Sequence, residues 1–190
     1  MAFDQGFIRE RCERSAAAVM KLGAQADTIE RIGVAVRSAL RSGGTVFTCG
    51  NGGSAAEAFH LSEELIGKYR STRRPLAGLC LNADPTALTC IANDFGFDEV
   101  FARQIEGLGK KGDVLVAFST SGRSRNVIRG LEAARARGVS TIGLLGKGGG
   151  PARSLCDIAL IVDHEATEVI QECHQVIVHL ILEAVESEGS

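Results

Sequence analysis

The segment TVFTCGNGGSAAEAFHLSEEL, residues 45–65, places a short apolar run directly before a glycine-rich turn and a longer amphipathic stretch. The run TVFTC has the length and composition of a strand that is buried on both faces. The glycines of GNGGS, residues 50–54, permit positive φ angles and a close approach of the backbone to a ligand. Ser54 can then cap the helix that follows. We therefore expect a buried strand, a tight turn and a helix that begins near Ser54.

Four further apolar runs resemble TVFTC in length and in their content of Val, Ile and Leu. They are LAGLCL, DVLVAF, STIGLL and IALIV, residues 76–81, 113–118, 140–145 and 158–162. Longer amphipathic segments separate these runs. The alternation is typical of an α/β fold with a parallel sheet. We expect a three-layer sandwich in which helices cover both faces of a central five-stranded sheet.

Helical patterns also lie outside the strand-containing part of the chain. Residues before Leu22 have a helical pattern, and a second helix is indicated by apolar residues at spacings of three and four, namely Ile29, Ile32, Val36 and Leu40. A long C-terminal helix is expected from about Thr167 to Glu186. Extra apolar helix surface of this kind often packs against another subunit, so the sequence predicts an oligomer.

The composition limits the classes of partner and the compartment. A chain of 190 residues fits one domain, and a formal net charge of −2 gives no reason to expect a nucleic acid or an anionic membrane as partner. The six cysteines have no C-x-x-C spacing, and the sequence has neither a signal-peptide pattern nor an apolar run of about 18 residues. We interpret the cysteines as reduced core thiols of a cytoplasmic, single-domain protein spanning residues 1–190.

Two unusual turns follow strands that should end at the same edge of the sheet. The first is GNGGS, and the second is STSGRS, residues 119–124, which brings together Ser119, Thr120, Ser121 and Ser124. In parallel sheets ligands bind at this edge, where helix N-termini point their free N–H groups. Serine and threonine hydroxyls in a loop can also form hydrogen bonds with their own backbone and bind no ligand. Four hydroxyls within six residues at this position favour a phosphate site instead. Because neither turn matches a P-loop or a dinucleotide fingerprint, a phosphorylated metabolite is the favoured ligand.

Two histidines and one carboxylate form the candidate reactive group. His60 and Glu64 lie one helical turn apart on one face. His179 interrupts the apolar run VIVHLIL and shares a polar flank with Gln171, Glu172 and Gln175. Taken singly, the histidine is typical of the core and the His–Glu pair of a surface ion pair. Together they could bind a divalent metal such as zinc or act as acid and base. His164 and His174 are interpreted as structural.

Four segments of the sequence carry a resemblance to a known family. CGNGGSAAEAFHLSEEL, ANDFGF, GDVLVAFSTSGRSRNVI and IQECHQVIVH resemble the phosphoheptose isomerases of the sugar isomerase (SIS) domain family. The resemblance implies a single SIS domain and a homotetramer with sites at subunit interfaces. It also implies isomerisation of D-sedoheptulose 7-phosphate to D-glycero-D-manno-heptose 7-phosphate. That reaction begins the synthesis of nucleotide-activated heptose for bacterial lipopolysaccharide.

The resemblance also implies roles for individual residues. Phosphate would be held by Ser119, Ser121 and Ser124. The rest of the substrate would contact Asn51, Gly52, Gly53, Ser54, Asp94, Thr120 and Gln171. One zinc ion per subunit would bind to His60, Glu64, Gln171 and His179. Glu64 and His179 would be the catalytic acid–base pair.

Some features leave other interpretations open. A neutral amide binds zinc weakly, so Gln171 is expected to orient substrate as much as to bind metal. Glu57 and Glu168 replace aspartates that the resemblance leads us to expect, and their longer side chains put any direct role in doubt. Related SIS proteins also serve as non-catalytic scaffolds that bind the bacterial replication initiator, or as sugar-phosphate sensors. A scaffold has no need for the two histidines and the carboxylate, so the isomerase is favoured.

Overall fold

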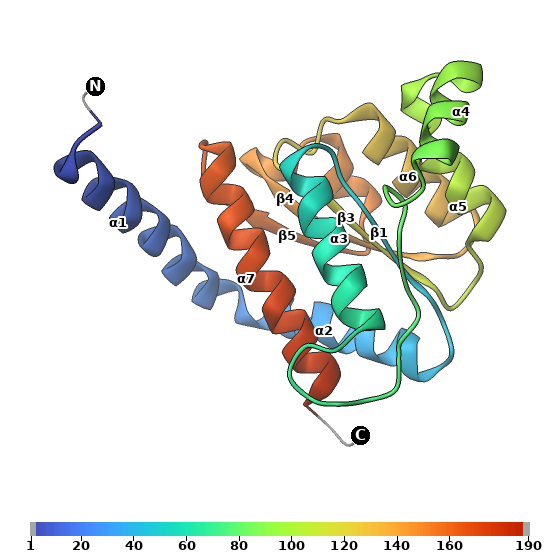
Figure 1. Cartoon of the computed structure of the whole chain (residues 1–190), viewed down its shortest axis with the longest axis horizontal. Helices are drawn as coiled ribbons and strands as arrows, with labels where there is room; N and C mark the ends of the chain where they lie inside the picture. The colour runs from blue at the N-terminus through green and yellow to red at the C-terminus, as the bar shows by residue number, and fades with distance from the viewer. Residues whose placement is uncertain (1–2, 188–190) are drawn as a thin grey trace.

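The structure, a computed structural model, describes residues 3–187 and is built around one parallel sheet (Figure 1). Its five strands are arranged in the order β2-β1-β3-β4-β5. Their bounds are Val46–Cys49 for β1, Gly78–Cys80 for β2, Val114–Ser119 for β3, Ser140–Gly146 for β4 and Ile158–Val162 for β5. Each strand lies within or beside one of the five apolar runs, so the predicted strands are confirmed.

Helices cover both faces of the sheet, as predicted. One layer contains α2 (Ala26–Arg41), α3 (Gly53–Ile66) and α7 (Thr167–Glu186), and the other contains α5 (Ala102–Leu108) and α6 (Arg125–Ala136). Along β3, Val116 and Phe118 join the first core, whereas Leu115 and Ala117 join the second. This alternation follows from the period of two in a strand and explains why residues 114–118 are all apolar.

The first helix stands away from this sandwich. Helix α1 (Gln5–Lys21) has Ala18 as its one buried residue and continues through a 3₁₀ turn, Leu22–Gln25, into α2. Figure 1 shows α1 leading away from the body of the protein along the outer side of α7. An ion pair of 2.6 Å between Arg11 and Glu172 connects the two helices. The extra N-terminal helices and the long C-terminal helix are therefore confirmed, the latter at its predicted bounds.

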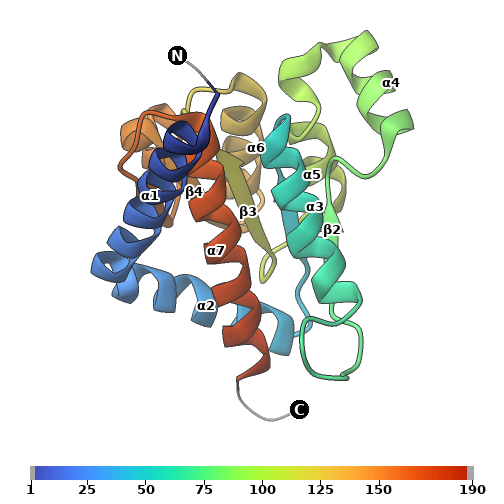
Figure 2. The same cartoon turned by 60° about the vertical axis from the view of Figure 1, so that its left-hand side comes forward.

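A second projecting element follows β2. Helix α4 (Pro85–Phe95) contains no buried residue and stands apart from the sheet in Figures 1 and 2. A 3₁₀ turn, Phe97–Glu99, connects it to the segment that leads into α5. Phe95 and Phe97 are about half exposed, at 52% and 61%. Two more 3₁₀ segments, Lys147–Gly149 and Pro151–Leu155, lie between β4 and β5.

The cysteines, all of them within the described residues, are free thiols. Cys49, Cys80 and Cys173 are buried and Cys156 is half-buried, but Cys12 and Cys90 are exposed. The prediction of core thiols is wrong for these two because α1 and α4 leave large parts of their surfaces uncovered. Within residues 3–187, no helix has both the length and the apolar character needed to cross a membrane.

Candidate active site

A cavity of about 250 Å³ lies at the carboxyl ends of the strands. We call it the strand-end cavity; it is lined by Asn51, Gly53, Ser54, Phe118, Ser119, Thr120, Ser124, Thr167 and Gln171. Helices α3, α6 and α7 all begin at or beside these residues. Three helix N-termini therefore face one small space, which is a favourable site for an anion.

The glycine-rich turn shapes one wall of the strand-end cavity. Gly52 is the N-cap of α3 and has a φ of +57°, a conformation that favours glycine. Ser54 therefore lies inside the first turn, so the prediction that it caps the helix is wrong. Its side chain is buried and lines the cavity instead. The amide of Asn51 is held in place by reciprocal hydrogen bonds of 2.8 and 2.9 Å with Asn126, a partner that the sequence did not indicate.

The serine-rich turn, STSGRS at residues 119–124, forms the second wall. Ser119 is buried, and its Oγ accepts a hydrogen bond of 3.1 Å from the N–H of Gly122. Gly122 has a φ of +61°, and a Cβ there would overlap the carbonyl of Gly149, so only glycine fits. Ser121 accepts a hydrogen bond of 3.2 Å from the N–H of Arg123. Among the predicted phosphate ligands, Ser119 and Ser124 line the cavity, whereas Ser121 does not.

Helix α7 supplies the third wall. Thr167 is its first residue, and Gln171 lies one turn later. The Gln171 amide lies so close to Gly53 that a Cβ on Gly53 would be 2.8 Å from its Oε1. Thr167 is a site residue that no motif in the sequence indicates, although the predicted start of the C-terminal helix after the last parallel strand is a signal for it.

Besides Ser121, two predicted substrate residues lie outside the lining of this cavity. Gly52 shapes the turn without lining the space. Asp94 lies on α4, where its carboxylate accepts hydrogen bonds of 2.7 Å from the Asn93 amide and 3.7 Å from the Cys90 thiol. The fold therefore gathers seven of the ten predicted substrate residues around one cavity and leaves Asp94 on the projecting helix.

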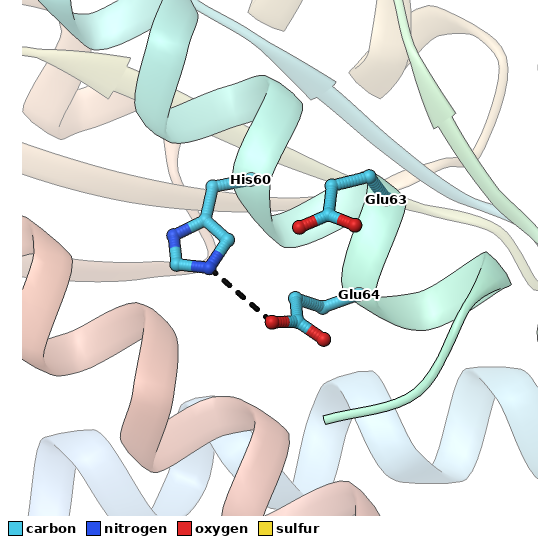
Figure 3. A group of neighbouring side chains, drawn as sticks. All are labelled: His60, Glu63 and Glu64. Carbon is cyan, nitrogen blue, oxygen red and sulfur yellow. Dashed lines mark ion pairs between the residues drawn. The ribbon is translucent and has the colours of Figure 1, made fainter. Parts of the chain in front are cut away.

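The predicted reactive side chains meet further along α3 and α7. We use the term imidazole cluster for His60, Glu64, Gln175 and His179. Figure 3 shows His60 and Glu64 projecting side by side from α3, with 3.5 Å between Nε2 and Oε1. The rings of His60 and His179 are 5.3 Å apart at 84°. Gln175 Nε2 contacts His60 Nδ1 and lies 3.4 Å from His179 Nε2. The structure thus shows that the two helices meet, which the sequence did not.

The cluster offers the donor types that bind zinc. Ligand atoms of His60, Glu63 and Glu64 lie within 4.8 Å of one another (Figure 3), and His179 faces the same His60 ring. Imidazole and carboxylate donors suit this metal. Gln171, in contrast, lies against Gly53 at the strand-end cavity. The donor atoms of His60, Glu63 and Glu64 therefore suit a zinc ion, whereas His179 lies beside the His60 ring but outside the group of ligand atoms within 4.8 Å of one another. Within one chain the amide beside both imidazoles belongs to Gln175.

Comparisons with known proteins identify the family of the chain. A family model described as the SIS domain matches residues 12–146. A phosphoheptose isomerase of Rhodospirillum rubrum is 46% identical over 179 residues, which cover 94% of this chain and 95% of that protein. The chain belongs to the phosphoheptose isomerase family of SIS-domain proteins. As a member of this family it is an enzyme, an aldose–ketose isomerase.

Solved structures of phosphoheptose isomerases share the fold over nearly the whole chain. The one from Francisella tularensis has a TM-score of 0.93 at 31% identity and covers 96% of this chain and 98% of its own. The one from Neisseria gonorrhoeae has a TM-score of 0.83 at 36% identity and covers 95% and 100%. The similarity therefore includes α7, which carries the second half of the imidazole cluster.

In this member of the phosphoheptose isomerase family, an aromatic ring supports His179. The Tyr69 ring stacks on the imidazole with 5.6 Å between centroids and an interplanar angle of 24°. The Glu186 carboxylate accepts hydrogen bonds of 3.2, 3.1 and 2.9 Å from the backbone N–H groups of Tyr69, Arg70 and Ser71. The end of α7 thereby fixes the loop that places Tyr69 on His179.

Arg73 connects the same loop to the end of α3. It forms a largely buried ion pair of 3.1 Å with Glu186 and donates hydrogen bonds of 2.7 and 2.9 Å to the carbonyls of Glu64 and Leu65. Burial raises the pKa of Glu186, but the three backbone N–H groups and the guanidinium outweigh it and hold the pKa below its ordinary value. The charged form of Glu186 therefore stabilises both helices of the imidazole cluster.

A second acid–imidazole pair lies in the core between α3 and α7. His174 is fully buried, and its Nδ1 lies 3.5 Å from Oε2 of Glu57. Its Nε2 is 3.3 Å from the carbonyl of Leu145. The interpretation of His174 as structural agrees with this burial. Glu57 is not among the residues that line the strand-end cavity, and Glu168 lies exposed in the first turn of α7.

The two parts of the site are well separated along α3. Ser54 lines the strand-end cavity, and Glu64 follows ten residues later. At the rise of an α-helix this separation is about 15 Å. His60 is six residues from Ser54, or about 9 Å along the axis.

Proposed function

We propose that the protein converts D-sedoheptulose 7-phosphate to D-glycero-D-manno-heptose 7-phosphate. The observation that carries the proposal is the structure of α3, whose N-terminus lines an anion-binding cavity and whose next turns present His60 and Glu64 to His179. Relatives named phosphoheptose isomerase at 46% and 50% identity support the substrate. The reaction would be cytoplasmic and would begin the synthesis of nucleotide-activated heptose for lipopolysaccharide.

The phosphate would occupy the strand-end cavity. Hydroxyls of Ser119, Thr120 and Ser124 surround this space, and the N-termini of three helices provide partial positive charge. Ser121 would take part through its position in the turn. These groups bind ground state and transition state alike, so they supply uniform binding and not rate acceleration.

The imidazole cluster would perform the isomerisation. Moving a carbonyl from C2 to C1 requires a base to take a proton from C1, which leaves a cis-enediol, and then to return a proton to C2. Glu64 would move this carbon-bound proton. His179 would transfer protons to and from the two oxygens, and Tyr69 would hold its ring in place by stacking.

One zinc ion per subunit is proposed at His60, Glu64 and His179. When bound, zinc supplies Lewis-acid polarisation of the carbonyl. Gln171, the fourth ligand implied by the resemblance, lies at the strand-end cavity in this chain, and we propose that it orients the substrate there. Asn51 would do the same, since its paired amide is already fixed by Asn126.

The proposed assembly is a homotetramer with sites at subunit interfaces. Ser54 and Glu64 lie about 15 Å apart along the axis of α3, and we propose that a neighbouring chain completes each site. An apolar groove of about 510 Å³ between α1, α2 and α7, lined in part by Val19, Leu22, Ile29, Val176 and Leu180, supports association with another copy. Asp94, on projecting helix α4, would reach the substrate of a neighbouring copy.

Activity and shared sites can be tested with one set of proteins. The parent protein should convert sedoheptulose 7-phosphate. Phosphate binding without turnover would favour a sensor. A protein that neither binds phosphate nor converts the substrate would favour a scaffold. A Glu64→Gln variant and a Ser119→Ala/Ser124→Ala double variant should each be nearly inactive at low substrate concentration. Subunit exchange between them should restore activity, because some mixed sites contain both intact halves. A mixture no more active than its components would contradict sites shared between chains.

Deleting residues 1–25 tests the role of the N-terminal helices. The deletion removes α1 and one wall of the apolar groove. It should abolish both tetramer formation, measured by light scattering, and isomerase activity. A fully active monomer would contradict the proposed assembly.

A further inference from the structure

The strand-end cavity lacks a balancing charge among the residues that line it. None of its nine lining residues has an ionisable side chain, whereas a sugar phosphate carries close to two negative charges at neutral pH. Helix N-termini contribute only partial charges. A nearby cation would complete the site, and neither the sequence nor the resemblance indicated one.

Lys147 lies at the rim of this cavity. Its ammonium donates a hydrogen bond of 3.3 Å to Oγ1 of Thr167, a lining residue at the start of α7. The preceding residue, Gly146, packs so closely against the serine-rich turn that a Cβ there would lie 2.7 Å from the carbonyl of Thr120. The backbone of Lys147 is thus next to one wall of the cavity, and its side chain reaches another.

The backbone of Lys147 is strained. Among residues 3–187 it is the one non-glycine residue with a positive φ, at +48°. A side chain in this left-handed region is unfavourable, and glycine would avoid the cost. The neighbouring positions 146, 148, 149 and 150 are all glycine, so a lysine here is the exception within its own loop.

The turn that carries Lys147 is fixed against the serine-rich turn. A Cβ on Gly150 would lie 2.8 Å from the carbonyl of Ser121, and the N–H of Ala152 donates a hydrogen bond of 3.1 Å to the carbonyl of Gly122. The guanidinium of Arg125, at the start of α6, instead pairs with Asp98 at 2.8 Å. Lys147 is therefore held toward the cavity while Arg125 is engaged elsewhere.

We propose that Lys147, together with Thr167, binds the phosphate group in the strand-end cavity as its cationic ligand. The inference rests on the proposed function, because it assigns a further residue to the same phosphate site. The ligand chemistry is a phosphate monoester dianion. Lys147 is far from the imidazole cluster in the chain and takes no part in proton transfer.

The test measures binding of inorganic phosphate to the full-length protein by calorimetry, and KM and kcat with sedoheptulose 7-phosphate. Lys147→Gln should weaken phosphate binding and raise KM, each by about 3- to 10-fold, which is the range for one charged hydrogen bond at a partly exposed site. It should lower kcat less than it raises KM. Its phosphate affinity should also depend less on salt concentration than that of the parent.

Three further variants separate charge from structure. Lys147→Arg keeps the cation and should retain most of the affinity. Lys111→Gln removes an exposed lysine elsewhere and should bind phosphate as the parent does. Lys147→Gly removes the charge and the strain together, so it should bind phosphate as weakly as Lys147→Gln while melting at a higher temperature than the parent.

The contrary results are equally distinct. Equal phosphate affinity for Lys147→Gln and Lys111→Gln would overturn the proposal. So would a larger loss of phosphate affinity in Arg123→Gln than in Lys147→Gln, because the cationic ligand would then belong to the serine-rich turn. The calorimetric measurements with inorganic phosphate do not depend on the substrate assignment. If the parent fails to convert sedoheptulose 7-phosphate, the proposed function fails, but the weakened phosphate binding of Lys147→Gln would still support the cation.

Discussion

The strand-end cavity and the imidazole cluster differ in how the chain builds them. The cavity is made at strand-to-helix turns from backbone N–H groups, short hydroxyl side chains and amides, without an ionisable group in its lining. The cluster is made from side chains on α3 and α7 that lie more than a hundred residues apart in sequence. The first depends on turns that the sheet fixes, whereas the second depends on two helices being packed and clamped together.

This difference separates binding from chemistry. Neutral dipoles at helix N-termini would bind a phosphate with little change during reaction, so we propose that the cavity anchors the substrate. A carboxylate beside two imidazoles can exchange protons, so we propose that the cluster performs the reaction. Variants of the cluster should therefore change kcat, and variants of the cavity should change KM.

His179→Asn is expected to have the largest effect among the variants that test this division. It removes the proposed acid–base group of α7 while keeping a polar side chain of similar reach. The rate should fall by about 10²- to 10⁴-fold, as for other general acid–base residues. Steady-state kinetics should show the loss in kcat, and a change confined to KM would place His179 with the binding residues.

Tyr69→Leu is expected to have an intermediate effect, because Tyr69 acts on His179 without taking part in proton transfer. Loss of the stacked ring removes about 0.5–1.5 kcal/mol of aromatic interaction, so kcat should fall by about 2- to 10-fold. Tyr69→Phe keeps the ring and is the matched control, with kcat near that of the parent. If both variants lose the same activity, the hydroxyl and not the stacking supports the cluster.

Ser124→Ala should act on the other part of the site. Ser124 is the N-cap of α6 but makes no side-chain capping hydrogen bond, so its removal leaves the helix intact. Loss of one of several hydroxyl donors to the phosphate should raise KM by about 2- to 10-fold with a smaller change in kcat. Ser140→Ala, at the amino-terminal end of β4 and so at the end of the strands opposite to the cavity, serves as the control and should leave KM unchanged. A fall in kcat alone would remove the distinction between the two regions.

The pH dependence of stability provides the smallest expected effect. Because the pKa of Glu186 is lowered in the folded protein, its contribution is complete above the ordinary pKa of glutamate and is lost as the pH falls through the lowered value. The free energy of unfolding of Glu186→Gln should therefore be lower than that of the parent at neutral pH. The difference should shrink as the pH falls below about 4.3. A difference that is independent of pH would show that the charge of Glu186 does not hold the Tyr69 loop.

The sheet and the serine-rich turn were predictable because their signals are local. Runs such as DVLVAF have the short, mostly apolar composition that is typical of a strand buried on both faces. The hydroxyls of residues 119, 120 and 124 are close together in the sequence and also line the same cavity. The pairing of His60 with Glu64 was equally local, one helical turn apart. In each case the spacing of the chain decides which side chains share a face.

The remaining contacts depend on tertiary packing, which no local pattern specifies. The stacking of Tyr69 on His179 and the clamp by Glu186 join a loop to a helix more than a hundred residues away. The position of Ser54 inside the first turn of α3 was missed because Gly52, in a left-handed conformation, takes the capping position. The placement of Gln171 against Gly53 likewise follows from the packing of α7 on α3.

The most direct test of the account concerns Glu64→Gln, a nearly isosteric change that keeps the helix but removes the group proposed to move the carbon-bound proton. The variant and the parent are mixed with sedoheptulose 7-phosphate in deuterated water, and NMR follows product formation and exchange of the carbon-bound hydrogens. Calorimetry measures binding separately. The account predicts that turnover and exchange fall by at least about 10²-fold while binding persists, because the strand-end cavity is untouched. Turnover and exchange near the parent rate would contradict the assignment of Glu64 as the base.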